Sequence, residues 1–239
     1  MEKDITTENI PVGANKKPWY KKVKLYLITF IFLLILAFVF AFIGSNVANQ
    51  NLDNTALIGD SKIPDELLYK HTEDDPTWGN NDAKIKIIEF SDFECPFCQE
   101  SFPVVRELLF KYLDDVYLVY RDFPDLINHP NSGKAAEAAN CAHEQGKFWP
   151  MHDKLFINQE NLSLDDLRIY AMEVGLETEA FAQCLNSGKY ATEIQQDYQD
   201  GVELGVIGTP TFFINGYKIS GSIPRDILFN IADAILATN

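Results

Sequence analysis

The sequence predicts one α/β domain that follows a single membrane-spanning helix. An uncharged, strongly apolar run fills residues 25–43. After it, short Ile- and Val-rich segments typical of buried strands alternate with longer stretches of helical periodicity. The 239 residues fit one large domain or two small ones.

The composition excludes several classes of protein. The chain has 20 Lys and Arg against 35 Asp and Glu, and this acidic balance argues against a nucleic-acid partner. The 13 Gly and 11 Pro exclude collagen-like and low-complexity chains. Four cysteines are too few for a disulfide-stapled mini-domain, but they suffice for one redox pair and one structural pair.

The apolar run has the properties of a membrane anchor. Its 19 residues span roughly 29 Å as a helix, the thickness of a bilayer core. Residues 1–24 carry six Lys against three acids, with Trp19 and Tyr20 among them. The positive-inside rule then places this tail in the cytoplasm and residues 44–239, with a net charge of −18, outside it.

The predicted organisation is therefore a basic tail (1–24), a signal anchor (25–43), an Asn-rich polar linker (44–64) and an extracytoplasmic domain (65–239) of a single-pass cell-membrane protein. A cleaved signal peptide is the main alternative. Its apolar region usually has about 7–15 residues, and cleavage after Ser45 or Ala48 is conceivable. A buried core helix is the third interpretation.

The domain shows strand and helix patterns in a recognisable order. Asn215-Gly216 lies between two short apolar segments, and Asn-Gly is the strongest signal for a two-residue hairpin turn. The predicted elements are a strand at 83–90, a helix at 103–113, a strand at 116–120, helices over 133–204, a hairpin at 211–220 and a last helix around 227–235.

The chemistry lies at Cys95-Pro96-Phe97-Cys98, which follows the first strand and opens a helix. Zinc binding normally needs a second such pair, whereas Cys141 and Cys184 are single. A purely structural disulfide is possible, but a four-residue loop at a helix start is exposed and strained. As a redox dithiol, Cys95 at the helix N-terminus would have a lowered pKa and act as nucleophile. Cys98 would resolve the mixed disulfide.

Residues 89–98, Glu-Phe-Ser-Asp-Phe-Glu-Cys-Pro-Phe-Cys, resemble the active-site strand and helix of thioredoxin-fold proteins, specifically the DsbA-like thiol–disulfide oxidoreductases. Four further segments resemble that family in the same order: 78–83, 120–131, 144–149 and 208–216. The resemblance runs from about Trp78 to the C-terminus. It implies a thioredoxin fold with a helical insertion at about 131–205.

The resemblance also implies roles for single residues. Glu89 occupies the position of a buried acid that exchanges the proton of Cys98. A solvent-facing strand glutamate is the alternative, although Ile88 and Phe90 favour a strand buried on both faces. Pro210 matches the family's cis-proline and Thr209 precedes it.

Four residues are predicted to form the substrate groove: Pro96, Phe97, Thr209 and Pro210. The backbone beside Pro210 would pair there with an extended substrate chain.

The other two cysteines and the histidines are less certain from the sequence. In an oxidising compartment, Cys141 and Cys184 on packed helices are expected to form a structural disulfide. Two free thiols or a shuttle pair are the alternatives. We expect the histidines of the insertion (His129, His143 and His152) to be structural.

Two features predict a milder oxidant than the strongest of the family. The strongly oxidising members carry a His between the active cysteines, and this chain has none. Glu94 also opposes a thiolate on Cys95 unless its side chain points away. The direction of the reaction therefore stays open.

The resulting hypothesis is an enzyme that forms disulfides in exported proteins and needs no cofactor or metal. Its partners would be cysteine-containing exported proteins and a membrane redox partner that recycles the dithiol. A reductase or isomerase is the first alternative. A thioredoxin-fold binding module whose cysteine pair is only structural is the second.

Overall fold

The computed structural model describes residues 31–38, 62–70 and 74–238. The chain divides into two units, residues 1–53 and 54–239. In the first unit, residues 31–38 form a helix whose large apolar side chains are exposed. The rest of the predicted 25–43 anchor lies outside the described residues. Among the helices that the structure describes, none combines the length and the apolar character needed to cross a membrane.

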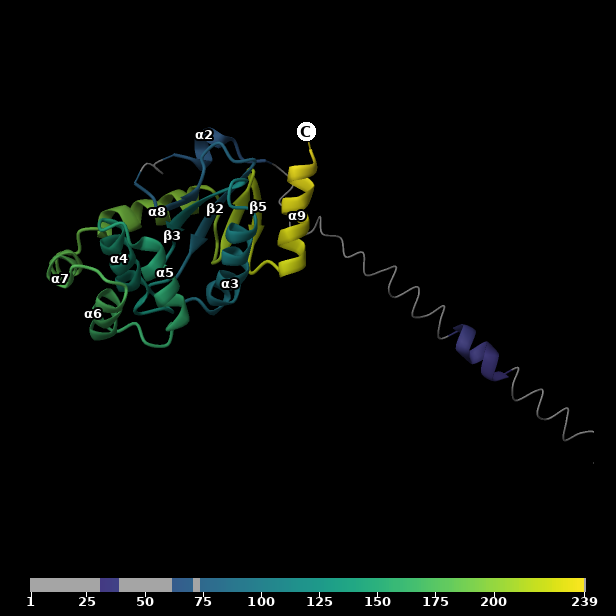
Figure 1. Cartoon of the computed structure of the whole chain (residues 1–239), viewed down its shortest axis with the longest axis horizontal. Helices are drawn as coiled ribbons and strands as arrows, with labels where there is room; N and C mark the ends of the chain where they lie inside the picture. The colour runs from purple at the N-terminus through teal and green to yellow at the C-terminus, as the bar shows by residue number, and fades with distance from the viewer. Residues whose placement is uncertain (1–30, 39–61, 71–73, 239) are drawn as a thin grey trace, which may run out of the picture. The chain divides into compact units, whose positions relative to one another are not determined.

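The second unit is built on a five-stranded mixed sheet with the order β1-β3-β2-β4-β5 (Figure 1). The central strand β2 pairs parallel with β3 and antiparallel with β4, and both edge strands pair antiparallel. The strands are β1 (Thr77–Gly79), β2 (Ile85–Ser91), β3 (Val116–Asp122), β4 (Thr211–Ile214) and β5 (Tyr217–Ser220).

Helices cover the sheet and extend it at one end. The short α2 (Asp65–Leu68) precedes the sheet, α3 (Pro96–Lys111) connects β2 to β3, and α9 (Arg225–Ala237) ends the chain. Five helices lie between β3 and β4: α4 (Ser132–His143), α5 (Phe148–Ile157), α6 (Leu164–Glu173), α7 (Thr178–Ser187) and α8 (Ala191–Glu203). In Figure 1, α4 to α7 form a group at the end of the sheet away from α9.

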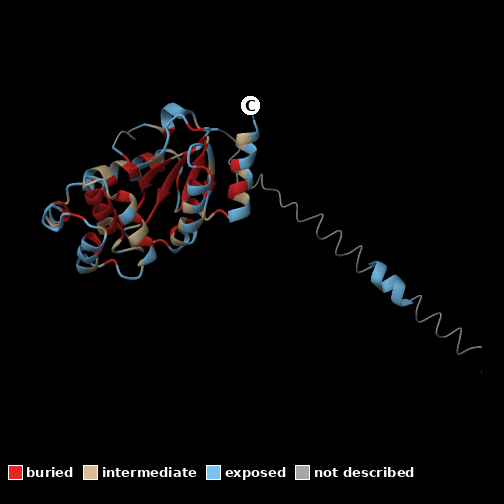
Figure 2. Cartoon of the chain, viewed as in Figure 1, coloured by how far each residue is buried: buried red, intermediate tan, exposed pale blue. Residues whose placement is uncertain are grey.

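The central strands are buried on both faces, as their Ile-rich sequence predicts. Successive side chains point to opposite faces. Ile85 and Ile87 pack with Leu108 of α3 and Phe229 of α9. Buried residues of the other parity, Ile88, Phe90 and Val119, pack with Leu68 and Val206. Figure 2 shows the buried residues concentrated in these strands.

The predicted order of elements is confirmed, with differences at the ends. The first helix begins at Pro96, directly after Cys95, as the position of the cysteine motif predicts, and the apolar stripe predicted at 103–113 lies in its second part, which ends at Lys111. The strand β1 was not predicted because it has only three residues. Its Gly79 has a φ of +87°, and a Cβ there would lie 2.0 Å from the Val116 carbonyl oxygen, so only glycine fits. The backbone N–H of Ile63 donates to the Gly216 carbonyl at 2.9 Å, two residues before the predicted domain start.

Candidate active site

The sequence places Cys95 and Cys98 at the start of α3. Cys95 is the extended N-cap residue, and Pro96 follows at the first helical position, where its missing N–H costs nothing. The backbone N–H of Cys98 donates to the Cys95 carbonyl at 3.1 Å, which closes the first turn. Both are free thiols, with Cys95 4% exposed and Cys98 fully buried. Cys95 also lines a surface cavity, whereas Cys98 does not, so the outer cysteine is the more accessible of the two.

The two thiols have opposite acidities. A hydrogen bond from the Cys98 thiol lowers the pKa of Cys95 to about 6; burial opposes this, while Thr209 and the first backbone N–H groups of α3 add to it. Burial raises the pKa of Cys98 well above its ordinary value, and the charge of Cys95 adds to that effect. At neutral pH the pair therefore holds one thiolate, on Cys95.

The Thr209–Pro210 peptide bond faces this pair and is cis. The Thr209 carbonyl oxygen lies 3.3 Å from the Cys95 sulfur, where it accepts a hydrogen bond from the neutral thiol. Two bonds hold the segment: the Thr211 hydroxyl donates to the Gly208 carbonyl at 2.7 Å, and the Gly221 N–H donates to the Pro210 carbonyl at 2.8 Å. The chain beside Cys95 is thus fixed in position.

Behind Cys98 lies a buried polar cluster on the face of the sheet that α3 covers. Glu89 of β2 sits between Tyr120 of β3 and Phe212 of β4 and is 3% exposed. Burial raises the pKa of Glu89 to about 7, and the nearby Ser91 opposes that shift only in part. Ser91 also opposes the raised pKa of Cys98 in part, so this residue lies near both the carboxyl and the inner thiol. Glu89 is therefore a buried, titratable carboxyl and not a solvent-facing one.

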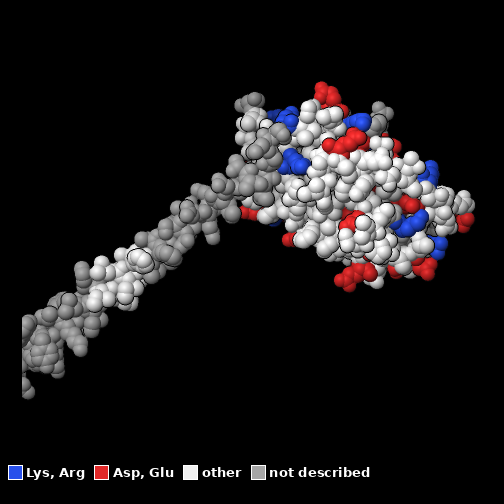
Figure 3. Space-filling view, turned by 180° about the vertical axis from the view of Figure 1, so that it is seen from behind, with Lys and Arg blue, Asp and Glu red and all other residues white. Residues whose placement is uncertain are grey.

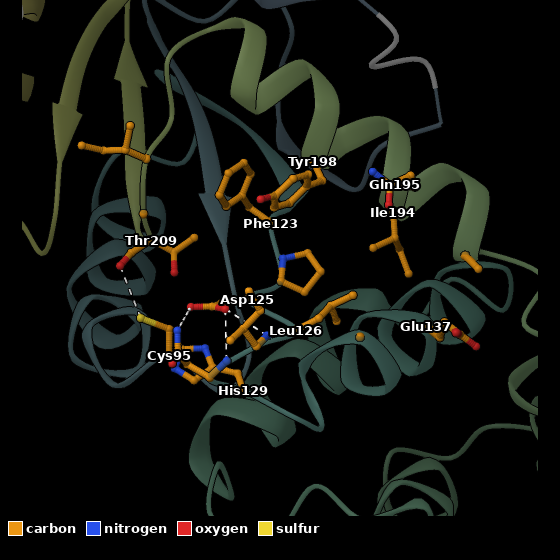
Figure 4. A pocket seen from close by; sticks show the side chains of 17 residues that line it. Cys95, Phe123, Asp125, Leu126, His129, Glu137, Ile194, Gln195, Tyr198 and Thr209 are labelled. Carbon is orange, nitrogen blue, oxygen red and sulfur yellow. Dashed lines mark hydrogen bonds between the residues drawn. The ribbon is translucent and has the colours of Figure 1, made fainter.

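A cavity of about 560 Å³ opens beside Cys95 (Figure 4). Its walls come from the segment after β3, from α8 and from the segment before Pro210. Leu126, Ile127 and Ile207 line it and are 65%, 92% and 93% exposed. Apolar side chains this open to water can bind the chain that flanks a reacting cysteine.

The predicted groove residues are distributed unevenly around this cavity. Thr209 lines it together with Cys95. Pro96 and Phe97 are exposed on the surface at the start of α3, and Pro210 is buried; none of these three lines the cavity. Their contact with a substrate stays a prediction.

Three polar residues beside Cys95 were not predicted as a group. The Asp92 carboxylate accepts a hydrogen bond from His129 Nδ1 at 2.7 Å. Glu94 points away from Cys95, because its carboxylate accepts bonds from the backbone N–H and the side-chain amide of Asn131 at 2.6 and 2.9 Å. The expected opposition of Glu94 to the thiolate is thereby reduced. His129 had been expected to be structural, and it lines the cavity with Cys95.

The remaining cysteines form a disulfide. Cys141 of α4 and Cys184 of α7 are bonded, with a Cα–Cα distance of 5.9 Å. The bond lies in the apolar core shared by α4 to α7, away from solvent. It crosslinks two helices of the insertion across 43 positions of the chain.

A second buried polar cluster surrounds Arg121 of β3, on the opposite face of the sheet from Glu89. Arg121 is fully buried and lies 2.5 Å from Asp197, 2.9 Å from Asp200 and 3.1 Å from Asp75. Asp75 lies in the segment before β1, and Asp197 and Asp200 lie on α8. Because these segments are far apart in the sequence, no local pattern predicted the cluster.

Part of this acidic cluster has the donors of a cation site. Oxygen atoms of Asp74, Asp75 and Glu193 lie within 4.8 Å of one another. The Asp75 carboxylate already pairs with the Arg121 guanidinium, which supplies positive charge to the cluster. We therefore do not assign a metal ion to these carboxylates.

Charge on the visible surface is dispersed. On the face in Figure 3, acidic and basic side chains stand singly or in small groups on a largely uncharged surface. Among the described residues of this face, no extended charged track is seen.

Comparisons with known proteins agree with this geometry. A family model described as Thioredoxin matches residues 71–233. The Na(+)/H(+) antiporter NhaA 3 of Salinispora tropica is 40% identical over 167 residues, which make up 70% of this chain and 26% of that protein. The chain thus spans about a quarter of the length of the curated relatives it matches.

Solved structures show the same fold. A thioredoxin-like oxidoreductase from Silicibacter pomeroyi is 27% identical, with a TM-score of 0.65 over 74% of this chain and 100% of that one. The thiol-disulfide exchange protein alpha-DsbA2 from Wolbachia pipientis is 20% identical, with a TM-score of 0.62 over 71% of this chain and 90% of that one, and it shows the fold alone. Because the family model covers about two thirds of its length, the chain belongs to the Thioredoxin family.

Proposed function

We propose that this chain is a thiol–disulfide oxidoreductase that forms disulfides in exported proteins through Cys95 and Cys98. The observation that carries the proposal is the asymmetry of the pair at the start of α3. Cys95 borders an open apolar cavity and has a pKa of about 6, while Cys98 is buried and its pKa is raised. One sulfur is thus equipped to react with a substrate and the other to resolve the intermediate.

The oxidative half-reaction starts from the Cys95–Cys98 disulfide. A substrate thiolate attacks the sulfur of Cys95, the bond between the two cysteines breaks, and its electron pair moves to the sulfur of Cys98. Cys98 then takes up a proton, for which the buried Glu89 carboxyl on that face is a titratable source. Its raised pKa keeps part of the Glu89 population protonated at neutral pH.

A second substrate thiolate completes the reaction. It attacks the substrate sulfur of the mixed disulfide, and Cys95 leaves as a thiolate. The substrate loses two electrons and the enzyme gains them. Because the thiolate of Cys95 is stabilised, it is a good leaving group, and the reduced enzyme is stabilised with it. This favours the oxidase direction over the reductase or isomerase direction.

The proposal includes an anchor at residues 25–43 that holds the domain outside the cytoplasm. The charge asymmetry of the sequence supports it, and so do the exposed apolar side chains of residues 31–38. An oxidant in the same membrane would recycle the dithiol. The cysteine-containing partners of the reaction would be proteins crossing that membrane.

The test is the reduction potential of the pair in the full chain, held in detergent and equilibrated with a glutathione redox series. A value of about −120 to −180 mV is expected for a disulfide donor. A value near about −270 mV would exclude the oxidase direction and indicate a reductase. The matched control is Cys95→Ser with Cys98→Ser, which keeps the Cys141–Cys184 bond and should show no transition in that range. A binding module would retain its partners in this control, whereas the oxidoreductase loses all exchange activity.

A further inference from the structure

The Asp92 side chain, three residues before the reactive cysteine, is a fixed hydrogen-bond acceptor. It is fully buried, and its two oxygens accept three hydrogen bonds. The backbone N–H groups of Glu94 and Asp125 donate at 2.8 Å each, and His129 Nδ1 lies at 2.7 Å. Because the Asp92 carboxylate accepts from Nδ1, the other ring nitrogen of His129 remains to carry the second proton.

The segment that carries His129 is itself well held. The His129 N–H donates to the Asp125 carbonyl at 2.8 Å, and the Ser132 N–H and hydroxyl both donate to the His129 carbonyl. Asp125 also accepts from the N–H of Asn128 at 3.1 Å. The imidazole is therefore held by its backbone as well as by Asp92.

The imidazole lies at the same end of the cavity as the reactive sulfur. Cys95 and His129 both line the cavity, and Figure 4 draws them at its lower end, below Thr209. The His129 side chain is 21% exposed, so it is partly shielded from water. Among the described residues that line the cavity, His129 is the one that can carry a positive charge.

We propose that His129, held by Asp92, is the cation that stabilises a thiolate on Cys95 and so sets the redox potential of the pair. The dipeptide between the cysteines, Pro96-Phe97, offers no charge of its own. A histidine from the segment after β3 takes the place of the histidine that this dipeptide lacks. The inference rests on the redox role proposed above, but not on its direction.

The charges around the imidazole favour its protonated form. Partial burial lowers the pKa of His129, but the bond to Asp92 and the charges of Asp92, Cys95 and Asp125 outweigh it, so the pKa is raised. These groups come from the segments after β2 and β3 and from the cap of α3. The interaction is mutual: if the thiolate of Cys95 favours the imidazolium, the imidazolium favours the thiolate equally. The negative charge of Asp92 opposes a thiolate on Cys95, but the three N–H groups that donate to Asp92 partly offset that charge.

The experiment compares the full chain with His129→Gln in detergent. Thiolate absorbance near 240 nm against pH gives the pKa of Cys95, and a glutathione series gives the equilibrium constant. We expect Cys95 to become about a tenfold weaker acid in His129→Gln. At pH 7 this change shifts the redox equilibrium roughly fivefold away from the reduced enzyme, which corresponds to a potential about 20 mV more negative. His129→Lys, which keeps a positive charge, should recover most of the loss.

The control is His143→Gln, a change of the same kind on α4 at a half-buried residue that does not line the cavity. This control should change neither the pKa of Cys95 nor the equilibrium constant with glutathione. Thermal unfolding of each variant shows that the fold is retained. Unchanged values in a folded His129→Gln protein overturn the inference, and so does an equal loss in His129→Lys. A wild-type potential near that of a reductase contradicts the proposed direction, but leaves this comparison between variants intact.

Discussion

Two buried polar clusters lie back to back on β2 and β3, and they are built differently. Glu89 pairs with Tyr120 on one face, and the next pair, Phe90 and Arg121, points to the other. Arg121 donates to Asp197 and Asp200 and pairs with Asp75, although the Asp75 oxygens accept no hydrogen bond among the described residues and burial raises the pKa of Asp75 to about 9. On the dithiol face, the Tyr120 hydroxyl and Ser91 Oγ are buried and have no hydrogen-bond partner among the described residues.

The two clusters differ in their central group, which is a cation with several acidic partners on one face and a carboxyl beside the dithiol on the other. A buried charge with several fixed partners is costly to disturb, since removing one member leaves the others uncompensated. The buried Glu89 carboxyl, with a pKa of about 7, is partly protonated near pH 7 and can titrate there. The dithiol face is therefore centred on a titratable carboxyl, while the Arg121 face is centred on a cation paired with several acids.

The largest effect is expected at Arg121. Arg121→Met places an uncharged side chain of similar length in the same buried site. It leaves Asp75, Asp197 and Asp200 without the cation that pairs with them. The free energy of unfolding should fall by about 3–5 kcal/mol, measured by urea denaturation at pH 7. The potential of the Cys95–Cys98 pair should change little, because the cluster lies on the opposite face of the sheet.

The control for Arg121 is Arg168→Met. Arg168 pairs with Asp165 on the surface of α6 at 3.0 Å, with both side chains open to solvent. Such pairs contribute about 0–1 kcal/mol. If both variants lose the same small amount, ion pairing does not hold the Arg121 face, and the contrast between the clusters disappears.

The sequence could predict the dithiol face because its residues lie close together along the chain. Cys95, Cys98 and Glu89 fall within ten positions, and a strand followed by a helix start fixes how they face one another. The last helix and the hairpin were also local patterns. Their Asn215-Gly216 turn has positive φ at both residues, as that dipeptide predicts.

The pairs that the sequence did not predict join distant segments. Asp92 and His129 are 37 positions apart, and Arg121 and Asp197 are 76 apart. Neither pair produces a periodic or regularly spaced pattern in the sequence. The sequence of a strand also does not distinguish a buried arginine from an exposed one unless the partners of the arginine are known. The spacing of Asp197 and Asp200 on one face of a helix was the one available signal.

The second prediction concerns the dependence of stability on pH at Glu89. Its pKa is raised from 4.5 to about 7 in the fold, so the unfolded chain ionises first as the pH rises. The native state is then penalised, and stability falls between about pH 4.5 and 7. Above that window the penalty is roughly 3 kcal/mol. Glu89→Gln removes it, so this variant should be more stable than the wild type at pH 8 and similar at pH 4.

Urea denaturation at the two pH values measures this difference. The matched control is Glu173→Gln, whose side chain is exposed on α6 and pairs with Lys154. It should shift stability by less than about 1 kcal/mol at either pH. A Glu89→Gln protein that is equally destabilised at pH 4 and pH 8 would show that the carboxyl is held by partners, as Arg121 is.

The smallest effect is expected at Tyr120. Its ring stacks on Phe93 with centroids 5.4 Å apart, while its buried hydroxyl finds no partner among the described residues. Tyr120→Phe keeps the ring and removes a polar atom that costs free energy to bury. The free energy of unfolding should therefore change by no more than about 1 kcal/mol. Thermal unfolding at pH 7 gives the value. A loss above about 2 kcal/mol would mean that the hydroxyl is bonded, for example to a buried water, and Tyr120 would then not be an unsatisfied member of the dithiol face.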